Sequence, residues 1–426
     1  MNNSSKGPPA LLTMPDYTGT LAALRGLGER GVRVTVSGSR LLATSRWSRY
    51  AASFVRCPDQ RNEAAYLEWL LEFGERNPGY FLYPTSDDIV WLLARNEVEL
   101  RRRFLMYQPG QQAMLQFIDK HRLYQACARA QLDTPSSWFP IGEEAALRLG
   151  PELPYPVILK PRSQAMLYSW SKGSLVRSAD ELLPAWRERV ARDRYSPEME
   201  SVFGIVPDPI IQRYCDGAAN SIYSIAGFID ESGELLGVRA AVKVLQRPRR
   251  VGFGVCFESA PVLEPVTQAI LRLCREVGYF GIFEAEFVVE DGRYMLIDFN
   301  PRFYGQMEME HQRGLPLAWL SFLGATGDRD GQRAIARESA QRGDGDEYAF
   351  CHRFFLEFSL AARRAAGLSN AAEHRRWREW CASHRGHIAD ATASKRDPLP
   401  AVAQALSQVL EVARHPRRLM RLVGDA

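Results

Sequence analysis

The strongest hydrophobic pattern in the chain consists of two apolar runs, residues 285–290 and 294–299, on either side of Asp291 and Gly292. An Asp-Gly dipeptide between two such runs is typical of a tight turn that joins antiparallel strands. The pattern therefore predicts a β-hairpin, and the faces of its two strands decide what chemistry the hairpin can carry.

The acidic and amide side chains of this hairpin fall on matching faces, because strand residues point alternately to the two sides of a sheet. Glu284 and Glu286 share one face of the first strand. Asp298 and Asn300 share one face of the second. Oxygen ligands suit Mg²⁺ when the ion also binds phosphates, which predicts a metal site at Glu286, Asp298 and Asn300. Arg302, two residues after Asn300, could reach a phosphate oxygen with its planar guanidinium group. The simpler interpretation is a half-buried hairpin whose acids face water.

Two lysines upstream occupy positions that a bound phosphate would explain. Lys160 lies in residues 156–161, an apolar run that predicts a buried strand stopped by proline. An unpaired buried ammonium group is costly, and a nucleotide phosphate would supply its partner. Lys120 opens a predicted helix that ends before residues 133–135. For Lys120 alone, a solvated lysine at a helix start is the simpler interpretation.

More positive charge lies around a further predicted strand at residues 208–214. Lys172 lies near the end of the loop at residues 163–173, where backbone amides and a cation could cover phosphates. Lys243 and the basic run at residues 247–250 add charge farther on. A surface loop and a solvated turn are the simpler interpretations of these two segments.

The N-terminal part of the chain has the pattern of a doubly wound α/β unit. Residues 19–36 predict an amphipathic helix followed by a strand, and residues 81–84 predict another short strand. Residues 85–88 offer N-cap side chains for a helix that runs to residue 100. Gly26 and Gly28 fall within the first helix and not in a strand-to-helix turn, which argues against a nicotinamide dinucleotide site.

Composition and Gly-rich segments suggest where the domains end. Borders are expected near residues 109–110 and within residues 324–345, where Gly and Asp suit an exposed connection. A helical period at residues 401–413 predicts a helical C-terminal extension. The basic end at residues 415–422 is interpreted as a solvated helical face in preference to a lipid or nucleic-acid contact. The predicted domains are residues 1–110, 111–330 (lobes of about 111–207 and 208–330) and 345–426.

Composition is that of a globular enzyme. Of the 426 residues, 46% are hydrophobic and 24% charged, and the net charge of +4 does not point to nucleic acid. The seven cysteines are scattered singly, as expected for reduced thiols in a cytoplasmic protein without structural zinc. No apolar stretch is long enough to span a bilayer. Residues 1–10 are expected to be a disordered lead-in, and His311 and His352 have no evident partners in the sequence.

The segment Asp298-Phe299-Asn300-Pro301-Arg302 is similar to the (Glu/Asp)-x-Asn-Pro-Arg strand ending of the ATP-grasp superfamily, and the lysine segments precede it in the expected order. The chain most resembles the carboxylate–amine ligase branch that includes D-aspartate ligase. The resemblance implies α/β and α+β architecture: a doubly wound N-terminal domain, a two-lobed ATP-grasp fold and the helical extension.

The resemblance also implies site roles, with ATP and Mg²⁺ (or Mn²⁺) as cofactors. The implied residues are metal ligands Glu286, Asp298 and Asn300; nucleotide-binding residues Lys120, Lys160, Lys172, Gln212, Arg213, Tyr214 and Cys215; and catalytic residues Lys243 and Arg302. The chain departs from the pattern in two places. Many members have Glu where this chain has Asp298, and Ala219 stands where relatives hold ribose with an acid. Asp216 or Asn220 could substitute.

The implied reaction activates a carboxylate as an acyl phosphate and joins it to an amine, forming an amide with release of ADP and phosphate. The implied partners are a small carboxylate and an amine, with an amino acid or peptide plausible, no nucleic acid and no membrane; a homodimer is compatible with the sequence. Two alternatives stay open: a bicarbonate-activating ATP-grasp carboxylase and a non-catalytic nucleotide-binding protein.

Overall fold

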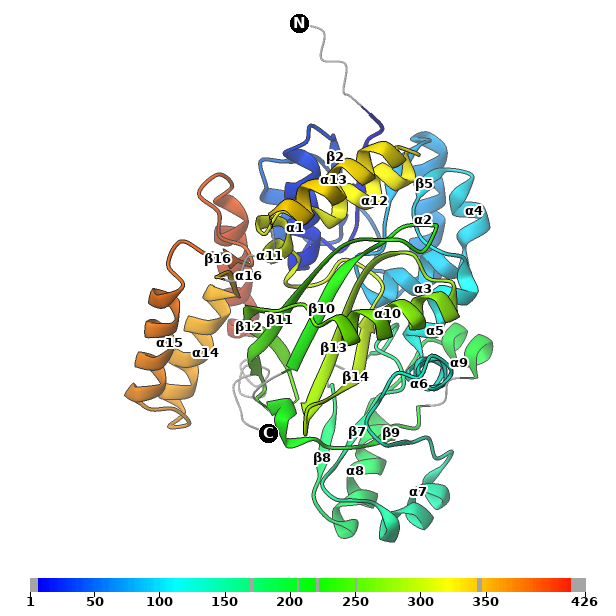
Figure 1. The fold of residues 1–426 in the computed structure, drawn as a ribbon, viewed down its shortest axis with the longest axis vertical. Helices are drawn as coiled ribbons and strands as arrows, with labels where there is room; N and C mark the ends of the chain where they lie inside the picture. Colours follow the sequence, from blue (N-terminus) through cyan, green and yellow to red (C-terminus); the bar gives the residue numbers. More distant parts are fainter. Residues whose placement is uncertain are drawn as a thin grey trace, which may run out of the picture.

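Three β-sheets organise the chain in the computed structural model, which describes residues 7–168, 172–204, 207–219, 222–249, 251–342 and 347–414. Figure 1 shows the seven-stranded sheet in the centre, the N-terminal domain above it and the small four-stranded sheet below it. The C-terminal helices lie beside the edge of the central sheet that carries β12. The N-terminal domain and the small sheet therefore lie at opposite ends of the central sheet.

The N-terminal domain is a parallel five-stranded sheet in the order β3-β2-β1-β4-β5, as predicted for a doubly wound unit. The central strand β1 is fully buried and has only three residues, so it is too short to show a periodic pattern in the sequence. The predicted helix to residue 100 is two helices that meet at Asn96, and Ser86 caps the first of them. The elements are β1 (Ala10–Leu12), α1 (Thr18–Gly28), β2 (Val34–Gly38), η1 (Thr44–Trp47), β3 (Ala51–Arg56), α2 (Glu63–Arg76), β4 (Tyr80–Leu82), α3 (Asp87–Arg95), α4 (Glu97–Arg101) and β5 (Phe104–Met106).

The small lobe is built on the four-stranded sheet β6-β9-β7-β8. Strand β9 pairs with β7 and β6, so the chain passes to the large sheet only after β9. Helix α6 begins at Lys120, as predicted, with the Asp119 side chain as its N-cap. The elements are α5 (Gln111–Ile118), α6 (Lys120–Arg129), β6 (Ser137–Trp138), α7 (Glu143–Leu149), η2 (Gly150–Glu152), β7 (Val157–Lys160), β8 (Ser174–Val176), α8 (Ala179–Arg192), α9 (Pro197–Phe203), β9 (Ile210–Arg213) and η3 (Asp216–Ala219).

The large sheet has the order β14-β13-β10-β11-β12-β15-β16. The Gly- and Asp-rich segment expected to be an exposed connection instead contains helix α13. Asp328 caps this helix by accepting a hydrogen bond from the Gly331 amide, which explains why a segment rich in turn residues is helical. The elements are β10 (Ile222–Ile229), β11 (Leu235–Arg247), β12 (Phe253–Ala260), α10 (Glu264–Val277), β13 (Gly281–Glu290), β14 (Arg293–Asn300), α11 (Met307–Gln312), α12 (Leu317–Ala325) and α13 (Arg329–Gln341).

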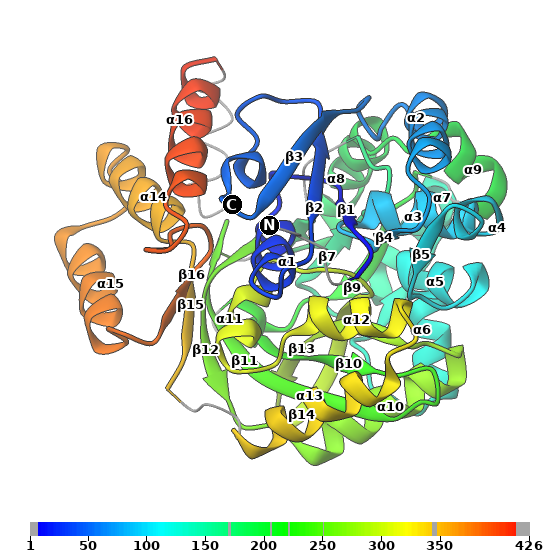
Figure 2. The same cartoon turned by 90° about the horizontal axis from the view of Figure 1, so that it is seen from above.

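The C-terminal extension is mainly helical, as predicted, and it also adds two short strands to the large sheet. Strand β15 pairs antiparallel with β12, and β16 continues the sheet beyond it. Figure 2 shows α14 and α15 stacked on this side of the molecule. The elements are β15 (Ala349–Cys351), α14 (Arg353–Ala365), α15 (Ala371–Ser383), β16 (Ile388–Asp390) and α16 (Leu399–Arg414). The basic end predicted at residues 415–422 lies outside the described residues.

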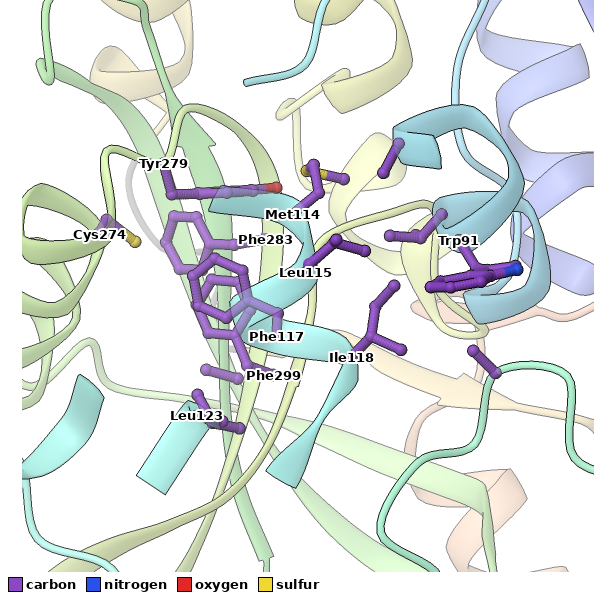
Figure 3. Close-up of a cluster of buried hydrophobic side chains, with 14 of the residues drawn as sticks. Trp91, Met114, Leu115, Phe117, Ile118, Leu123, Cys274, Tyr279, Phe283 and Phe299 are labelled. Atoms are coloured by element: carbon purple, nitrogen blue, oxygen red, sulfur yellow. The ribbon is translucent and has the colours of Figure 1, made fainter. Parts of the chain in front are cut away.

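The largest apolar cluster joins the N-terminal domain to the central sheet. Figure 3 shows Trp91 and Ile118 on one side and the aromatic rings of the sheet on the other. The rings of Phe117 and Phe299 stack with centroids 4.0 Å apart, and Phe283 stacks on Phe299. Burial of these rings contributes several kcal/mol and fixes which face of β13 and β14 is turned to the core.

The fold gives partners to the two histidines that had none evident in the sequence. His311 lies 3.0 Å from a Glu29 oxygen, and His352 accepts a hydrogen bond from the Phe355 amide, so both histidines have partners.

All seven cysteines are free thiols. Among the described helices, none has the length and apolar character that crossing a membrane requires.

A buried ion pair ties the C-terminal extension to the N-terminal domain. Arg25 on α1 donates to an Asp397 carboxylate oxygen at 3.0 Å, and both side chains are at most 4% exposed. Asp397 also accepts hydrogen bonds from the Ser48 hydroxyl and the Arg49 amide. The carboxylate is therefore the point where three segments far apart in sequence meet.

Replacing Asp397 with Ala should lower the free energy of unfolding by about 3–5 kcal/mol, because it leaves the Arg25 guanidinium buried without its carboxylate. Urea denaturation followed by circular dichroism measures the change. The control is Glu144→Ala, which removes an exposed ion pair with Arg148 and should change stability by at most about 1 kcal/mol. Equal effects of the two substitutions would show that the Asp397 junction is not a principal anchor.

Candidate functional site

The β13–β14 hairpin forms with the predicted turn. Asp291 and Gly292 both have positive φ, at 50° and 74°, as a two-residue hairpin turn requires. In the resulting register Glu286 lies directly opposite Asp298, and Glu284 lies opposite Asn300. The four side chains identified from strand alternation are thus brought to one end of the hairpin.

The aromatic core directs the acids away from it. Phe283, Ala285 and Phe287 alternate with the two glutamates along β13 and are completely or almost completely buried. Their packing leaves Glu286 on the opposite face, toward the small lobe. The register shifts between Glu286 and Phe287, which marks a bulge, and both Ile297 and Asp298 line the same pocket. Strict alternation alone predicts Asp298 there but not Ile297.

A pocket between the small lobe and the large sheet is lined by ten of the twelve predicted site residues. The exceptions are Asn300 and Arg302. Helix α6, strands β7 and β9, and strands β11, β13 and β14 all contribute side chains to its wall. The ten residues are Lys120, Lys160, Lys172, Gln212, Arg213, Tyr214, Cys215, Lys243, Glu286 and Asp298.

Each of the two pocket carboxylates is paired with a lysine. Lys120 Nζ lies 2.6 Å from an Asp298 oxygen, and Lys243 Nζ lies 2.5 Å from a Glu286 oxygen. Burial alone would raise the pKa of Asp298, but the positive charge of Lys120 and Lys172 outweighs it and lowers this pKa to about 2. Burial would also raise the pKa of Glu286, but the positive charges of Lys243 and Lys172 outweigh this effect and lower the pKa. Both carboxylates are ionised at neutral pH.

Lys160 is held by a partly buried hydrogen-bond network that the sequence did not reveal. Its ammonium group donates to Gln212 Oε1 at 2.8 Å. The Gln212 amide nitrogen in turn donates to the Tyr124 hydroxyl and to Ser137 Oγ. The resemblance implies that Gln212 binds the nucleotide, and in the structure its side chain positions Lys160. The network links β7, β9 and α6. Two of these elements carry phosphate-binding candidates, Lys160 on β7 and Lys120 on α6.

The environment of Lys160 disfavours its charged form. Burial, followed by repulsion from nearby Lys120, lowers the pKa of Lys160 to about 7. Burial also lowers the pKa of Lys172, whose ammonium lies over the Phe253 ring at 4.5 Å from the centroid. Four lysines thus face two carboxylates, and an added anion would balance this excess of positive charge.

Asn300 and Arg302 do not line the pocket wall, and their side chains form hydrogen bonds next to it. The Asn300 amide donates to Glu284 Oε2 at 2.6 Å, and its Oδ1 accepts from Arg302 at 2.7 Å. Arg302 also forms a two-point ion pair with Asp87 at the start of α3. Arg302 therefore contacts the N-terminal domain in this state, and its predicted role toward a phosphate stays a prediction.

Glu284 is the buried acid that sequence reasoning left unassigned. It is 1% exposed and accepts hydrogen bonds from Ser224, Asn300 and Gln306. Burial, with a smaller contribution from Glu286, raises the pKa of Glu284 to about 7. Its hydrogen bond to Asn300 fixes which way that amide faces. The alternation along β13 was the available signal, since it puts Glu284 and Glu286 on one face.

The end of β9 and the two residues that follow it were predicted to bind the nucleotide. The Arg213 side chain forms an ion pair with Glu290, and the Tyr214 amide donates to the Pro156 carbonyl oxygen at 3.1 Å. Tyr214 and the buried Cys215 lie on the pocket wall. Asp216 opens η3 immediately after them. Asn220, the other candidate for ribose, and Arg250 of the basic run lie outside the described residues.

The donor set suits a divalent cation that shares its coordination with a substrate. Within the described ranges, no three His, Cys, Asp or Glu side chains come together in a way that could hold a metal ion. Glu286 and Asp298 nevertheless supply two ionised carboxylates on opposed strands. Mg²⁺ is commonly bound by one or two carboxylates together with phosphate oxygens and waters, so this pair fits it.

Comparison with known sequences finds limited similarity. No protein-family profile matches the chain. A segment of 184 residues is 25% identical to the C-terminal section of the carbamoyl phosphate synthase large chain from Methanocaldococcus jannaschii. That match covers 42% of this chain and 27% of that protein section. The chain therefore matches about a quarter of that relative's length.

Solved structures are similar over most of the chain. Biotin carboxylase from Campylobacter jejuni, solved as a β,γ-ATP complex, has a TM-score of 0.59 at 19% identity and covers 76% of this chain and 72% of its own. An L-amino acid ligase from Bacillus licheniformis has a TM-score of 0.56 at 14% identity, with 81% and 79% covered. The ADP complex of N5-carboxyaminoimidazole ribonucleotide synthetase has a TM-score of 0.52 at 14% identity, with 71% and 72% covered. All three are ATP-grasp proteins. With the three sheets and the pocket between the lobes, these matches identify the chain as a protein with the ATP-grasp fold.

Proposed function

We propose that this protein is an ATP-dependent ligase that activates a carboxylate as an acyl phosphate and joins it to an amine, with release of ADP and phosphate. The observation that carries the proposal is the pocket in which Lys120, Lys160, Lys172 and Lys243 converge on Glu286 and Asp298. A triphosphate with a divalent cation would supply negative charge to balance the four lysines and a metal ion for the two carboxylates.

The chain's own residues neutralise and orient the phosphates. When a triphosphate binds, Lys120 and Lys243 exchange their carboxylate partners for phosphate oxygens. Lys160 is held by Gln212 on the wall of the same pocket, where it would meet a phosphate. Glu286 and Asp298, once released by the lysines, are the residues that would hold Mg²⁺. The metal would supply positive charge that withdraws electrons from the transferred phosphoryl group.

The proposed reaction needs no side-chain nucleophile. A carboxylate oxygen of the substrate attacks the γ-phosphorus, and the bond from this phosphorus to the oxygen of ADP breaks. The amine then attacks the carbonyl carbon of the acyl phosphate, phosphate leaves, and the amine loses a proton. The protein contributes positioning and charge stabilisation, which are the main catalytic contributions in phosphoryl transfer.

The structural neighbours support ATP-dependent carboxylate activation and differ in the reaction for which they are named. The L-amino acid ligase is named for ligation of amino acids, and the biotin carboxylases are named for carboxylation. The biotin carboxylase domain of the 2-oxoglutarate carboxylase from Hydrogenobacter thermophilus was solved as a dimer with MgADP and bicarbonate. A bicarbonate-activating reaction is therefore the second candidate. The amine-ligating reaction is preferred because the loop around Lys172 has few glycines, as in the carboxylate–amine branch.

The proposed reaction predicts its products. Incubation with ATP, Mg²⁺ and mixtures of amino acids and small acids should release ADP and phosphate only with a suitable acid, and mass spectrometry should find an amide. With an ¹⁸O-labelled carboxylate, one ¹⁸O should appear in the released phosphate, because the acyl phosphate forms through a carboxylate oxygen. AMP and pyrophosphate as products, or phosphate without label, would contradict the mechanism. Stimulation by bicarbonate alone would select the second candidate.

The lowered pKa of Lys160 predicts that nucleotide binding depends on pH. Its pKa of about 7 in the free protein should rise when phosphates surround it, so binding takes up a proton and affinity falls as pH rises above about 7. Calorimetry of ADP binding at pH 6 to 9 measures this. Lys160→Arg stays charged over this range and should flatten the profile, which also corrects for titration of the nucleotide.

Lys160→Ala should weaken binding throughout that range, by about 1–3 kcal/mol for a charged hydrogen bond. Parallel pH profiles for the parent protein and Lys160→Arg, or unchanged affinity in Lys160→Ala, would place Lys160 outside the phosphate site.

A further inference from the structure

The strand β11 has one face in the nucleotide pocket and the other against the C-terminal extension. Gln246 lines the pocket, whereas Leu245 packs into a cluster with Leu356 and Trp377 of α14 and α15. Arg247 pairs with Glu373 on α15, so its side chain is turned to the extension, as that of Leu245 is. The last residues of β11 thus connect the pocket wall to the extension directly.

Arg247 is held by a side chain of the extension. Its guanidinium is fully buried and donates to Glu373 Oε1 on α15 at 2.8 Å. The other carboxylate oxygen of Glu373 lies 3.9 Å from Arg363 Nε on α14. Asn370 caps α15 by accepting a hydrogen bond from the Glu373 amide, which fixes the backbone that carries this carboxylate. Glu373 therefore joins both helices of the extension to the end of β11.

The backbone of Arg247 in turn supports the pocket wall. A Cβ atom placed on Gly252 would lie 2.3 Å from the Arg247 carbonyl oxygen, so the returning chain packs directly on this peptide group. Gln246 Nε2 donates to the Arg249 carbonyl oxygen at 2.9 Å and braces the same turn. Gln246, Val251 and Gly252 all line the pocket. A shift of Arg247 must therefore move the wall.

We infer that Glu373, in the C-terminal extension, is a positioning residue of the nucleotide pocket: it holds Arg247 and thereby sets the wall formed by Gln246, Val251 and Gly252. This inference rests on the proposed nucleotide site. It gives the extension a role in substrate binding in addition to covering the edge of the sheet at β12. Loss of the Glu373 carboxylate removes the ion pair that holds the Arg247 guanidinium against α15, which frees the end of β11 to shift.

The test compares three variants of the full-length protein by calorimetry of ADP binding with Mg²⁺. Glu373→Gln should raise the dissociation constant between about twofold and about thirtyfold, the range found for residues that act on a site through their neighbours. Glu379→Gln, an exposed glutamate on the same helix, should leave it unchanged. Trp380→Phe removes the hydrogen bond from Trp380 to Glu258 on β12 and loosens the extension at a second point.

A purely structural role of Glu373 predicts that Glu373→Gln and Trp380→Phe weaken binding in proportion to their losses of melting temperature. The positioning role predicts that only Glu373→Gln weakens binding. It also predicts faster hydrogen exchange in residues 244–254 of that variant, with unchanged exchange in β13 and β14. Unchanged affinity in Glu373→Gln, or proportional effects of the two substitutions, would overturn the inference. Failure of the parent protein to bind ADP would instead refute the proposed function.

Discussion

The packing of the aromatic face of β13 and β14 is the constraint on which the site depends. Phe283 and Phe299 stack in the core that joins the sheet to the N-terminal domain. With these rings inward, Glu286 and Asp298 must lie on the opposite face, opposed across the hairpin. A shift of one residue in register would turn the carboxylates into the core, so hydrophobic burial determines where the charged chemistry can occur.

The charges of the pocket are balanced only in part by the protein itself. Each carboxylate has a lysine partner, while Lys160 is held by the neutral amide of Gln212 and Lys172 lies over an aromatic ring. Burial and the nearby Lys120 disfavour the charged form of Lys160 and lower its pKa. A phosphate chain and a divalent cation would replace the lysine–carboxylate pairs by stronger ones. The same exchange would make nucleotide and metal binding mutually dependent.

Local patterns in the sequence predicted the hairpin, the helix that starts at Lys120 and the strand that ends at Lys160, because turn chemistry and alternation act over a few residues. They missed β1, which is three buried residues long, and misassigned α13, whose capping Asp328 resembles a loop residue. The contact of Arg302 with Asp87 spans 215 positions, and no local signal reports such a pair. The same limit applies to the link from Gln212 to Tyr124 and to the bulge that brings Ile297 into the pocket.

The central claim is that Glu286 and Asp298 hold a divalent cation beside phosphates bound by the lysines. A crystal structure with ADP and Mn²⁺, analysed for anomalous scattering, tests it most directly. The account predicts an anomalous peak at about 2.1 Å from oxygens of both carboxylates, with Lys120 and Lys243 turned to phosphate oxygens. A nucleotide bound with both lysine–carboxylate pairs intact, or a metal peak away from these two side chains, would contradict it.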